Sequence, residues 1–267
     1  MSSPSRPATN LAKPDVLDGL FASWRDIDDL LETLSAADWA TATSLPGWTV
    51  RDIVAHLVGT ESMLQGVPTP KTDIDVSTLE HVRNDIGVMN EHWVWNLRGL
   101  SVAELHEKFR SVTAERRKVL SDLPGEEWNT ITATPAGPDT YGRFMRVRIF
   151  DCWMHELDIR DAVARPSGSR ELAGSASTLA LDEMAASMGF VVGKLGGAPD
   201  GSRVKHRIDG PAAAGYQRVD GRPRSCRAGF RRAGAHVDDR IGRSAVHADR
   251  GRADGAGGSR RCDRLRR

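Results

Sequence analysis

The segment LPGWTVRDIVAHL, residues 45–57, decides the fold. Thr49 is followed three residues later by Asp52, a variant of the capping box in which a hydroxyl and a carboxylate each satisfy a free backbone group at a helix start. Trp48 and Ile53 bracket this cap as a hydrophobic staple. The segment therefore predicts a helix that begins near residue 50.

The same start signal occurs at two other places in the chain. Ser77 with Glu80, and Ser101 with Glu104, have the spacing of a capping box. Apolar residues follow each of them at helical spacing, so the ordered part of the chain is expected to be mainly α-helical. We expect helices over residues 14–35, 50–66, 78–99, 102–122, 141–165 and 175–195.

A faint internal repeat suggests how these helices are arranged. Leucine, tryptophan and two threonines recur with identical spacing in residues 34–43 and 123–132. Each copy follows a long helix and precedes a helix with a candidate metal ligand. Two helical hairpins that face each other would form an antiparallel four-helix bundle.

Composition limits the class of protein. The 267 residues are 39% hydrophobic and 27% charged, which is enough to form a core. No run approaches the ~18 apolar residues of a membrane helix, and the first 13 residues lack the apolar core of a secretory signal. Three cysteines cannot form a disulfide framework. We expect a cytoplasmic protein that does not contact a membrane, as a monomer or homodimer.

The net charge of +1 conceals two different kinds of polypeptide. Residues 218–267 contain 15 Arg and 6 Asp with no Lys or Glu, a charge of +9, which leaves −8 on residues 1–217. This tail cannot form a core by itself. It is a basic segment that binds nucleic acid, an ordinary disordered tail, or a stretch translated out of frame. We favour the last and do not expect nucleic acid as a partner.

Weak alternation over residues 204–208 and 215–219 predicts two strands, so a small α/β segment begins before the tail and is truncated by it. The expected organisation is a disordered N-terminus (1–13), a metal-binding bundle (14–165), a linker helix with the start of an α/β domain (166–217), and the Arg/Gly/Ala-rich tail (218–267).

The helix expected over 141–165 carries the main chemical signal. We expect its buried face at Val147, Phe150, Met154 and Leu157, with Asp151 inside that face. Asp151 and His155 are four residues apart, so both can bind one divalent ion. The alternative is an internal salt bridge from Asp151 to His155 or to Arg148.

His56 on the helix expected over 50–66 is either a structural histidine or a third ligand. As a ligand, it would complete a set of two histidines and one carboxylate with an open position, as in catalytic metal sites. Asp158 would orient a ligand or hold substrate, or else is a buried polar residue bonded to a neighbouring helix. His106 and the charged helix that follows Leu79 are expected to be solvated.

Several motifs resemble one family. Residues 45–52 running into Ala55-His56-Leu57, residues 81–87 followed by Asn90-Glu91, and residues 151–160 are similar to segments of the mycothiol-dependent maleylpyruvate isomerase family. The resemblance covers roughly residues 14–195. It implies a DinB-like four-helix bundle that binds one divalent metal, often zinc.

The resemblance also implies a ligand set and an activity. The family pattern of one histidine and an acidic-x3-His pair falls on His56, Asp151 and His155. The isomerase carries Glu where this chain has Asp151, which is shorter by one methylene, and the family usually continues into an α/β domain. Mycothiol would be the thiol cosubstrate, and a metal-activated thiolate would isomerise a small electrophile or be transferred to it. The alternative is a non-catalytic metal-binding bundle with a stress or sensing role, inactive because of its C-terminus.

Overall fold

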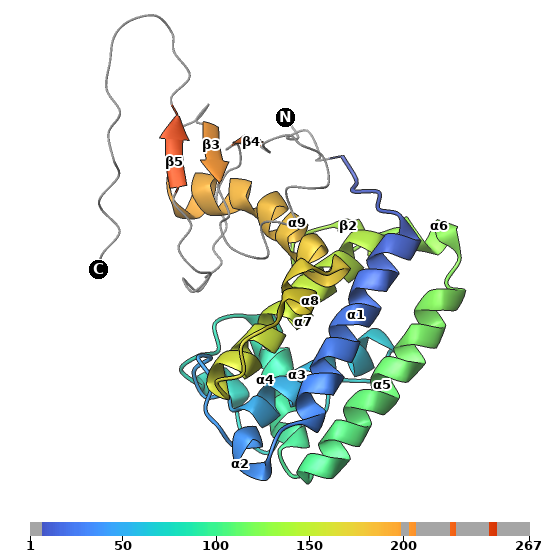
Figure 1. Ribbon diagram of the computed structural model, residues 1–267, viewed down its shortest axis with the longest axis vertical. Coiled ribbons are helices and arrows are strands. Elements are labelled where there is room, and N and C mark those ends of the chain that lie inside the picture. The colour runs from blue at the N-terminus through green and yellow to red at the C-terminus, as the bar shows by residue number, and fades with distance from the viewer. Residues whose placement is uncertain (1–6, 199–202, 207–224, 228–245, 250–267) are drawn as a thin grey trace, which may run out of the picture. The chain divides into compact units, whose positions relative to one another are not determined.

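The computed structural model of the chain describes residues 7–198, 203–206, 225–227 and 246–249 (Figure 1). They divide into two units, Met1–Ala180 and Leu181–Arg267. None of the described helices is long and apolar enough to cross a membrane. The first unit contains α1 (Lys13–Glu32), α2 (Ala36–Trp39), α3 (Val50–Leu64), the 3-10 turn η1 (Val76–Thr78), α4 (Asp85–Leu97), α5 (Val102–Asp122), α6 (Gly125–Trp128), the strands β1 (Ile131–Thr132) and β2 (Asp139–Thr140), α7 (Tyr141–Ala162) and α8 (Ser169–Ala173).

The predicted four-helix bundle is confirmed and consists of α1, α3, α5 and α7, each packed against two others. Thr9, just before α1, donates its backbone N–H to Asp139 Oδ1, just before α7 (2.7 Å), so these two helices start at the same end. Lys13, at the start of α1, donates to the carbonyl of Leu123, just after α5 (2.6 Å). Along α3, His56 lies beside Asp151 and Glu61 lies beside Arg148, so α3 runs antiparallel to α7. Two helices therefore run in each direction, and the neighbours α1 and α7 run parallel (Figure 1).

The N-terminal segment is attached to the bundle, at least in its described part. We expected residues 1–13 to be disordered, but Thr9 Oγ1 also donates to Asp139 Oδ2 (2.9 Å). Trp128 donates its indole N–H to the carbonyl of Leu11 (2.9 Å). Both contacts satisfy polar groups at the end of the bundle, which fixes the chain there before α1 begins.

α3 is buried on all sides over most of its length, although the sequence predicted only a stripe at Ile53, Leu57 and Leu64. It contacts α4, α5 and α7, so no side of it is left to solvent. A helix in this position must satisfy every polar side chain that it carries. Those buried polar side chains are Asp52, His56, Thr60 and Glu61.

The close packing of α4 on α3 depends on Gly59. A Cβ atom added at this glycine would lie 2.4 Å from Cβ and Cγ of Trp93 on α4. Because glycine lacks that atom, the backbone of α3 can lie directly against the tryptophan. This contact fixes the part of α4 that faces the bundle.

Local capping signals locate two helix starts correctly and one incorrectly. The Thr49–Asp52 and Ser101–Glu104 boxes both form, at the starts of α3 and α5. The expected Ser77 box does not form, because Asp75 Oδ1 accepts hydrogen bonds from the backbone N–H and the hydroxyl of Ser77 (3.0 and 2.6 Å). η1 ends at Thr78, and α4 begins only at Asp85, where Asn84 is the N-cap residue.

The internal repeat is a real structural correspondence. Each copy forms a single helical turn, α2 or α6, that ends on a buried tryptophan, Trp39 or Trp128. The backbone carbonyl of Thr41 then accepts a hydrogen bond from the backbone N–H of the first residue of α3. The carbonyl of Thr130 accepts one from the first residue of α7 in the same way, and both bonds are 3.0 Å long. The two site-bearing helices are thus started by equivalent turns.

The second unit begins at Leu181, within α9 (Ser175–Phe190). This helix continues into the π-helical turn η2 (Val191–Leu195). β3 (Arg203–His206) agrees with the first strand that we expected. It pairs antiparallel with β4 (Ser225–Arg227) and with β5 (Val246–Asp249), two short segments of the basic tail, which by its composition cannot form a core by itself. The second expected strand, 215–219, lies outside the described residues.

Candidate metal centre

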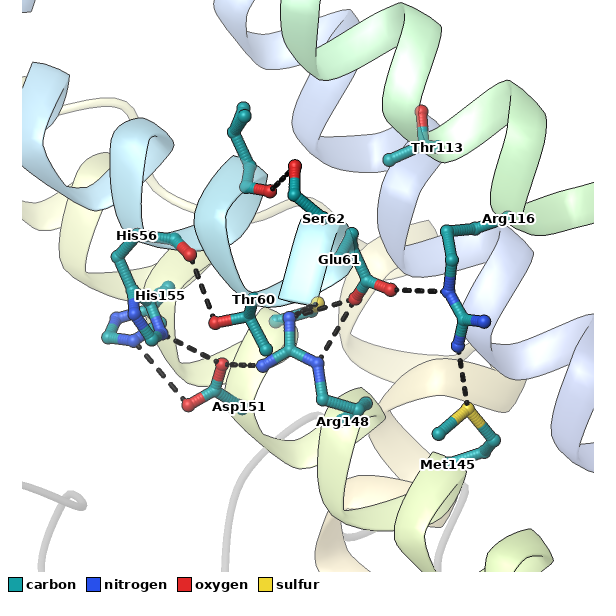
Figure 2. A network of polar contacts seen from close by, with 12 residues as sticks. His56, Thr60, Glu61, Ser62, Thr113, Arg116, Met145, Arg148, Asp151 and His155 are labelled. Carbon is teal, nitrogen blue, oxygen red and sulfur yellow. Dashed lines mark hydrogen bonds and ion pairs between the residues drawn. The ribbon is translucent and has the colours of Figure 1, made fainter. Parts of the chain in front are cut away.

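The three predicted ligand residues lie together where α3 crosses α7 (Figure 2). His56 Nε2 is 3.3 Å from Asp151 Oδ2, and His155 Nε2 is 3.6 Å from Asp151 Oδ1. One ligand atom from each residue lies within 4.8 Å of the others. The i, i+4 spacing on α7 places Asp151 and His155 on the same face, and the antiparallel crossing of α3 brings His56 to them.

These distances suit a small divalent ion. Ligand atoms at ~2.1 Å from a tetrahedral zinc ion are separated from one another by about 3.4 Å. The two imidazole-to-carboxylate distances, one to each oxygen of Asp151, fall on either side of that value, and one ligand atom from each of the three residues lies within 4.8 Å of the others. Two imidazoles and one carboxylate are also donors that zinc accepts. The residues present therefore fit a metal ion with small side-chain adjustments.

Asp158 sets the hydrogen bonding of His155. Its Oδ2 lies 3.2 Å from His155 Nδ1, and its Oδ1 accepts the hydroxyl of Ser44 (3.2 Å). A proton held on Nδ1 leaves Nε2, the atom that faces Asp151, with a free lone pair. Asp158 thus contacts a candidate ligand, as a residue that orients it would, and also Ser44, as a buried polar residue bonded to a neighbouring segment would.

His56 is held in the neutral form that a metal ligand needs. Burial lowers the pKa of its imidazole, and this effect outweighs the nearby Asp151, which acts in the opposite direction. Its Nδ1 is buried and has no hydrogen-bond partner among the described residues. The ring is packed edge-on against His155, with 4.9 Å between the ring centroids.

Asp151 also forms the ion pair that we considered as the alternative to a metal. Burial alone would raise the pKa of its carboxyl group, but the Arg148 guanidinium, followed by the two histidines, holds that pKa well below its usual range. Arg148 Nη1 bonds to Oδ2. Oδ1 therefore remains for His155 or for an ion, and the carboxylate is ionised at neutral pH.

Behind the ligands lies a buried ionic network that sequence analysis missed (Figure 2). Arg148 donates from Nε and Nη2 to Glu61 Oε1 (3.1 and 2.9 Å), and Arg116 donates from Nε to Glu61 Oε2 (3.0 Å). Arg116 also donates to the Tyr141 hydroxyl (3.1 Å). Two carboxylates thus balance two guanidinium groups, which is how buried charges are tolerated. The partners of Glu61 come from two other helices, so the sequence around this residue gave no signal of the network.

Trp48 lies over the two histidines. Its ring centroid is 5.3 Å from that of His56 and 6.2 Å from that of His155. We had predicted this tryptophan only as part of a hydrophobic staple. Its indole N–H bonds to Glu91 on α4, a residue that is buried although we expected this helix to be solvated.

Two further expectations need correction. The face of α7 that we expected to be buried is only half-buried, because α7 packs on its neighbours with Met145, Ile149 and Cys152 instead. The ligands consequently lie at the edge of the core, where Asp151 keeps 31% of its side chain exposed. His106 is half-buried rather than solvated, since its Nε2 lies 2.6 Å from Asp28 Oδ1.

Cys152, next to Asp151, cannot supply a nucleophile. Burial raises the pKa of its thiol to about 12, so the thiolate is absent at neutral pH. Its Sγ lies 3.7 Å from Arg148 Nη2, inside the core. The thiol next to the candidate ligands is therefore not available as a nucleophile.

The protein is therefore a four-helix bundle with a candidate metal site. Two histidines and one carboxylate with an open position are typical of catalytic metal sites. Residues 20–160 match the family described as Mycothiol maleylpyruvate isomerase N-terminal domain, which is more than half of the chain. The protein belongs to this family, as its motifs suggested.

Two relatives are the uncharacterized proteins MT0041 and Rv0036c of Mycobacterium tuberculosis strains. Each is 28% identical over 147 residues, which cover 54% of this chain and 56% of the relative. The match therefore spans about half the length of these relatives. Among solved structures, a histidine-to-alanine mutant of the mycothiol-dependent maleylpyruvate isomerase matches with a TM-score of 0.50 and 13% identity. It covers 72% of this chain and 75% of that protein, which shows similarity of fold.

Proposed function

We propose that this protein is a metal-dependent enzyme that uses mycothiol as its thiol cosubstrate and acts on a small electrophilic substrate. The observation that carries the proposal is the arrangement of His56, Asp151 and His155 within a bundle of the mycothiol maleylpyruvate isomerase family. Zinc is the ion that we expect, because the donors are two imidazoles and one carboxylate. When bound, such an ion would lower the pKa of a thiol at its open position, so that the thiolate exists at neutral pH.

The chain's own residues would prepare this chemistry. Asp158 holds the proton on Nδ1 of His155, which keeps Nε2 available. Arg148 keeps Asp151 ionised and fixes one of its oxygens. Burial keeps His56 neutral. Because Cys152 cannot form a thiolate, the sulfur nucleophile would come from the cosubstrate.

Two reactions follow from a thiolate held beside an activated double bond. The sulfur forms a bond to one alkene carbon while the π electrons move onto the conjugated carbonyl group. The former double bond is then a single bond, about which the substrate could rotate. Return of the electrons from the carbonyl group, with cleavage of the carbon–sulfur bond, would restore the double bond in the other geometry and complete cis–trans isomerisation. Protonation of the neighbouring carbon in place of sulfur departure would complete a thiol transfer.

A second candidate function is a non-catalytic metal-binding protein. The buried thiol of Cys152, next to the candidate ligand Asp151, is not available as a nucleophile, so the centre could hold an ion without a reacting group beside it. A stress or sensing role would use the same three ligands and no cosubstrate.

The test is thiol-dependent turnover by the zinc-loaded full chain. We expect conversion of maleylpyruvate, or formation of a thiol adduct detected by mass spectrometry, only when mycothiol is present. His155→Ala should abolish it, whereas His106→Ala, a histidine bonded to Asp28 instead, should not. Turnover that does not require mycothiol, or that persists in the His155→Ala chain, would contradict the enzyme proposal. A metal-loaded chain without turnover would favour the second candidate.

A further inference from the structure

Two motifs shared with the family remain unexplained by the three candidate ligands. One is the turn Leu45-Pro46-Gly47-Trp48 before α3, and the other is the segment from His81 to Glu91 that leads into α4. The structure joins them in one cluster, defined here as the Trp48 cluster: Gly47, Trp48, His81 and Glu91.

Glu91 is the centre of the Trp48 cluster. Its side chain is only 2% exposed, yet one oxygen, Oε1, lies 2.5 Å from the indole nitrogen of Trp48 and 2.7 Å from Nε2 of His81. Its other oxygen, Oε2, is buried and has no partner among the described residues. Burial of a carboxylate has a cost in desolvation, which the contacts of Glu91 with Trp48 and His81 must offset.

His81 is held in place by the turn itself. A Cβ atom added at Gly47 would lie 2.9 Å from Cε1 and 3.0 Å from Nδ1 of the His81 ring, and Gly47 has a positive φ of 79°. Only glycine allows both the backbone conformation and the contact. On its other side, the carbonyl of Gly47 accepts a hydrogen bond from Arg98 Nη2 (3.2 Å).

The Trp48 cluster leads directly to the candidate metal centre. Trp48 contacts both candidate imidazole ligands through its ring and contacts Glu91 through its indole N–H. Without the bond to Glu91, the indole N–H would be left unpaired in a partly buried position and the ring would be free to turn. A displaced ring would alter the packing of both imidazoles and the access of water to them.

We propose that Glu91 is a positioning residue of the metal centre, which acts through Trp48, and that His81 fixes the Glu91 carboxylate for this task. The inference rests on the proposed function, since it assigns the cluster to the same metal site. The role of Glu91 is to accept the Trp48 N–H, which requires an acceptor oxygen and not a negative charge.

The experiment is a cobalt titration of the full chain, followed by the visible d–d absorption, which reports coordination geometry. Glu91→Ala and Trp48→Phe should each weaken cobalt binding about tenfold and change the band shape, as loss of supporting contacts around metal ligands does. Glu91→Gln keeps an acceptor oxygen and should stay within about threefold of the wild type. The double variant should be no weaker than the weaker single variant, because both substitutions break one link.

The matched control is Asp139→Asn. Asp139 is a carboxylate of similar burial that pairs with Arg143 at the far end of α7. Its loss should lower stability and leave the cobalt spectrum unchanged. Should Glu91→Ala fail to fold by circular dichroism, Trp48→Phe and Glu91→Gln test the same link.

Four outcomes are informative. Equal cobalt binding and band shape in the wild type, Glu91→Ala and Trp48→Phe would overturn the inference while the proposed function stands. Single effects that multiply to about a hundredfold in the double variant would also overturn it, as would Glu91→Gln behaving like Glu91→Ala. Absence of cobalt binding in the wild type would instead overturn the proposed function and the inference with it.

Discussion

Glu61 carries one of the two negative charges of the buried network, and its replacement by glutamine removes that charge with little change in volume. Three guanidinium N–H groups, one from Arg116 and two from Arg148, donate to its carboxylate. After Glu61→Gln, two buried cations would face the single carboxylate of Asp151. Removal of one partner of a buried ion pair costs about 3–5 kcal/mol, because the other charge is left uncompensated.

The assay is urea unfolding of the full chain followed by circular dichroism, with thermal melts beside it. For a unit of this size each kcal/mol lowers Tm by about 2–4 °C, so we expect a decrease of roughly 10 °C. The matched control is Glu32→Gln. Glu32 pairs with Arg110 on the surface and is 58% exposed, so its loss should change stability by less than about 0.5 kcal/mol. A Glu61→Gln chain as stable as the Glu32→Gln chain would refute the assignment of Glu61 as the balancing charge.

Three other predictions test packing, pH dependence and ligand orientation. Gly59→Ala should destabilise the chain by about 1–3 kcal/mol in a thermal melt, because its Cβ would meet Trp93 at 2.4 Å; a neutral effect would contradict the close approach of α4. Burial of Asp139 would raise the pKa of its carboxyl group, but its hydrogen-bond donors outweigh this and lower that pKa. The unfolded chain therefore takes up the proton first, and stability should fall as the pH decreases below about 3.9. Urea unfolding at a series of pH values should show that the Asp139→Asn chain loses less free energy of unfolding in acid than the wild type. An identical dependence of that free energy on pH in the two chains would contradict this role of Asp139. Asp158→Ala should weaken zinc binding about 10–100-fold, measured by competition with a chelator, because His155 loses the acceptor at Nδ1; unchanged affinity would leave Asp158 without this role.

Local signals predicted the helices because a helix start is a local event. The capping boxes at Thr49 and Ser101 form as expected, since each satisfies its own backbone groups whatever the tertiary context. At Ser77 the same pattern failed because a stronger neighbour, Asp75, uses its hydroxyl. The sequence did not show which helices are neighbours, since α1 packs against α7 and α3 against α5, and neither pair is consecutive in the chain.

The candidate ligands could be found because spacing on one helix is visible in sequence. Asp151 and His155 share a face by their i, i+4 spacing, His56 on a second helix completed a set of two histidines and one carboxylate, and the family motif fell on the same three residues. The residues that support them could not be found in this way. Glu61, Arg116 and Glu91 come from three different helices, and only the packing of those helices shows that their charges are buried and paired.

The burial of α7 shows a related limit. Its apolar residues Val147, Phe150 and Met154 have helical spacing and suggested the core face, yet they are half-buried. The core-facing side instead includes Arg148, whose charge is balanced within the bundle. A hydrophobicity pattern along one helix cannot show that a buried arginine forms an ion pair with a carboxylate on another helix.

The most direct test of the account is the content of divalent metal per purified chain, measured by inductively coupled plasma mass spectrometry. The wild type should carry about one ion, and His56→Ala and Asp151→Ala should carry none while keeping their helical circular dichroism. His106→Ala, which removes a histidine that pairs with Asp28, should keep the ion. A wild type without metal, or an ion retained in both His56→Ala and Asp151→Ala, would contradict the claim that these residues form a metal centre.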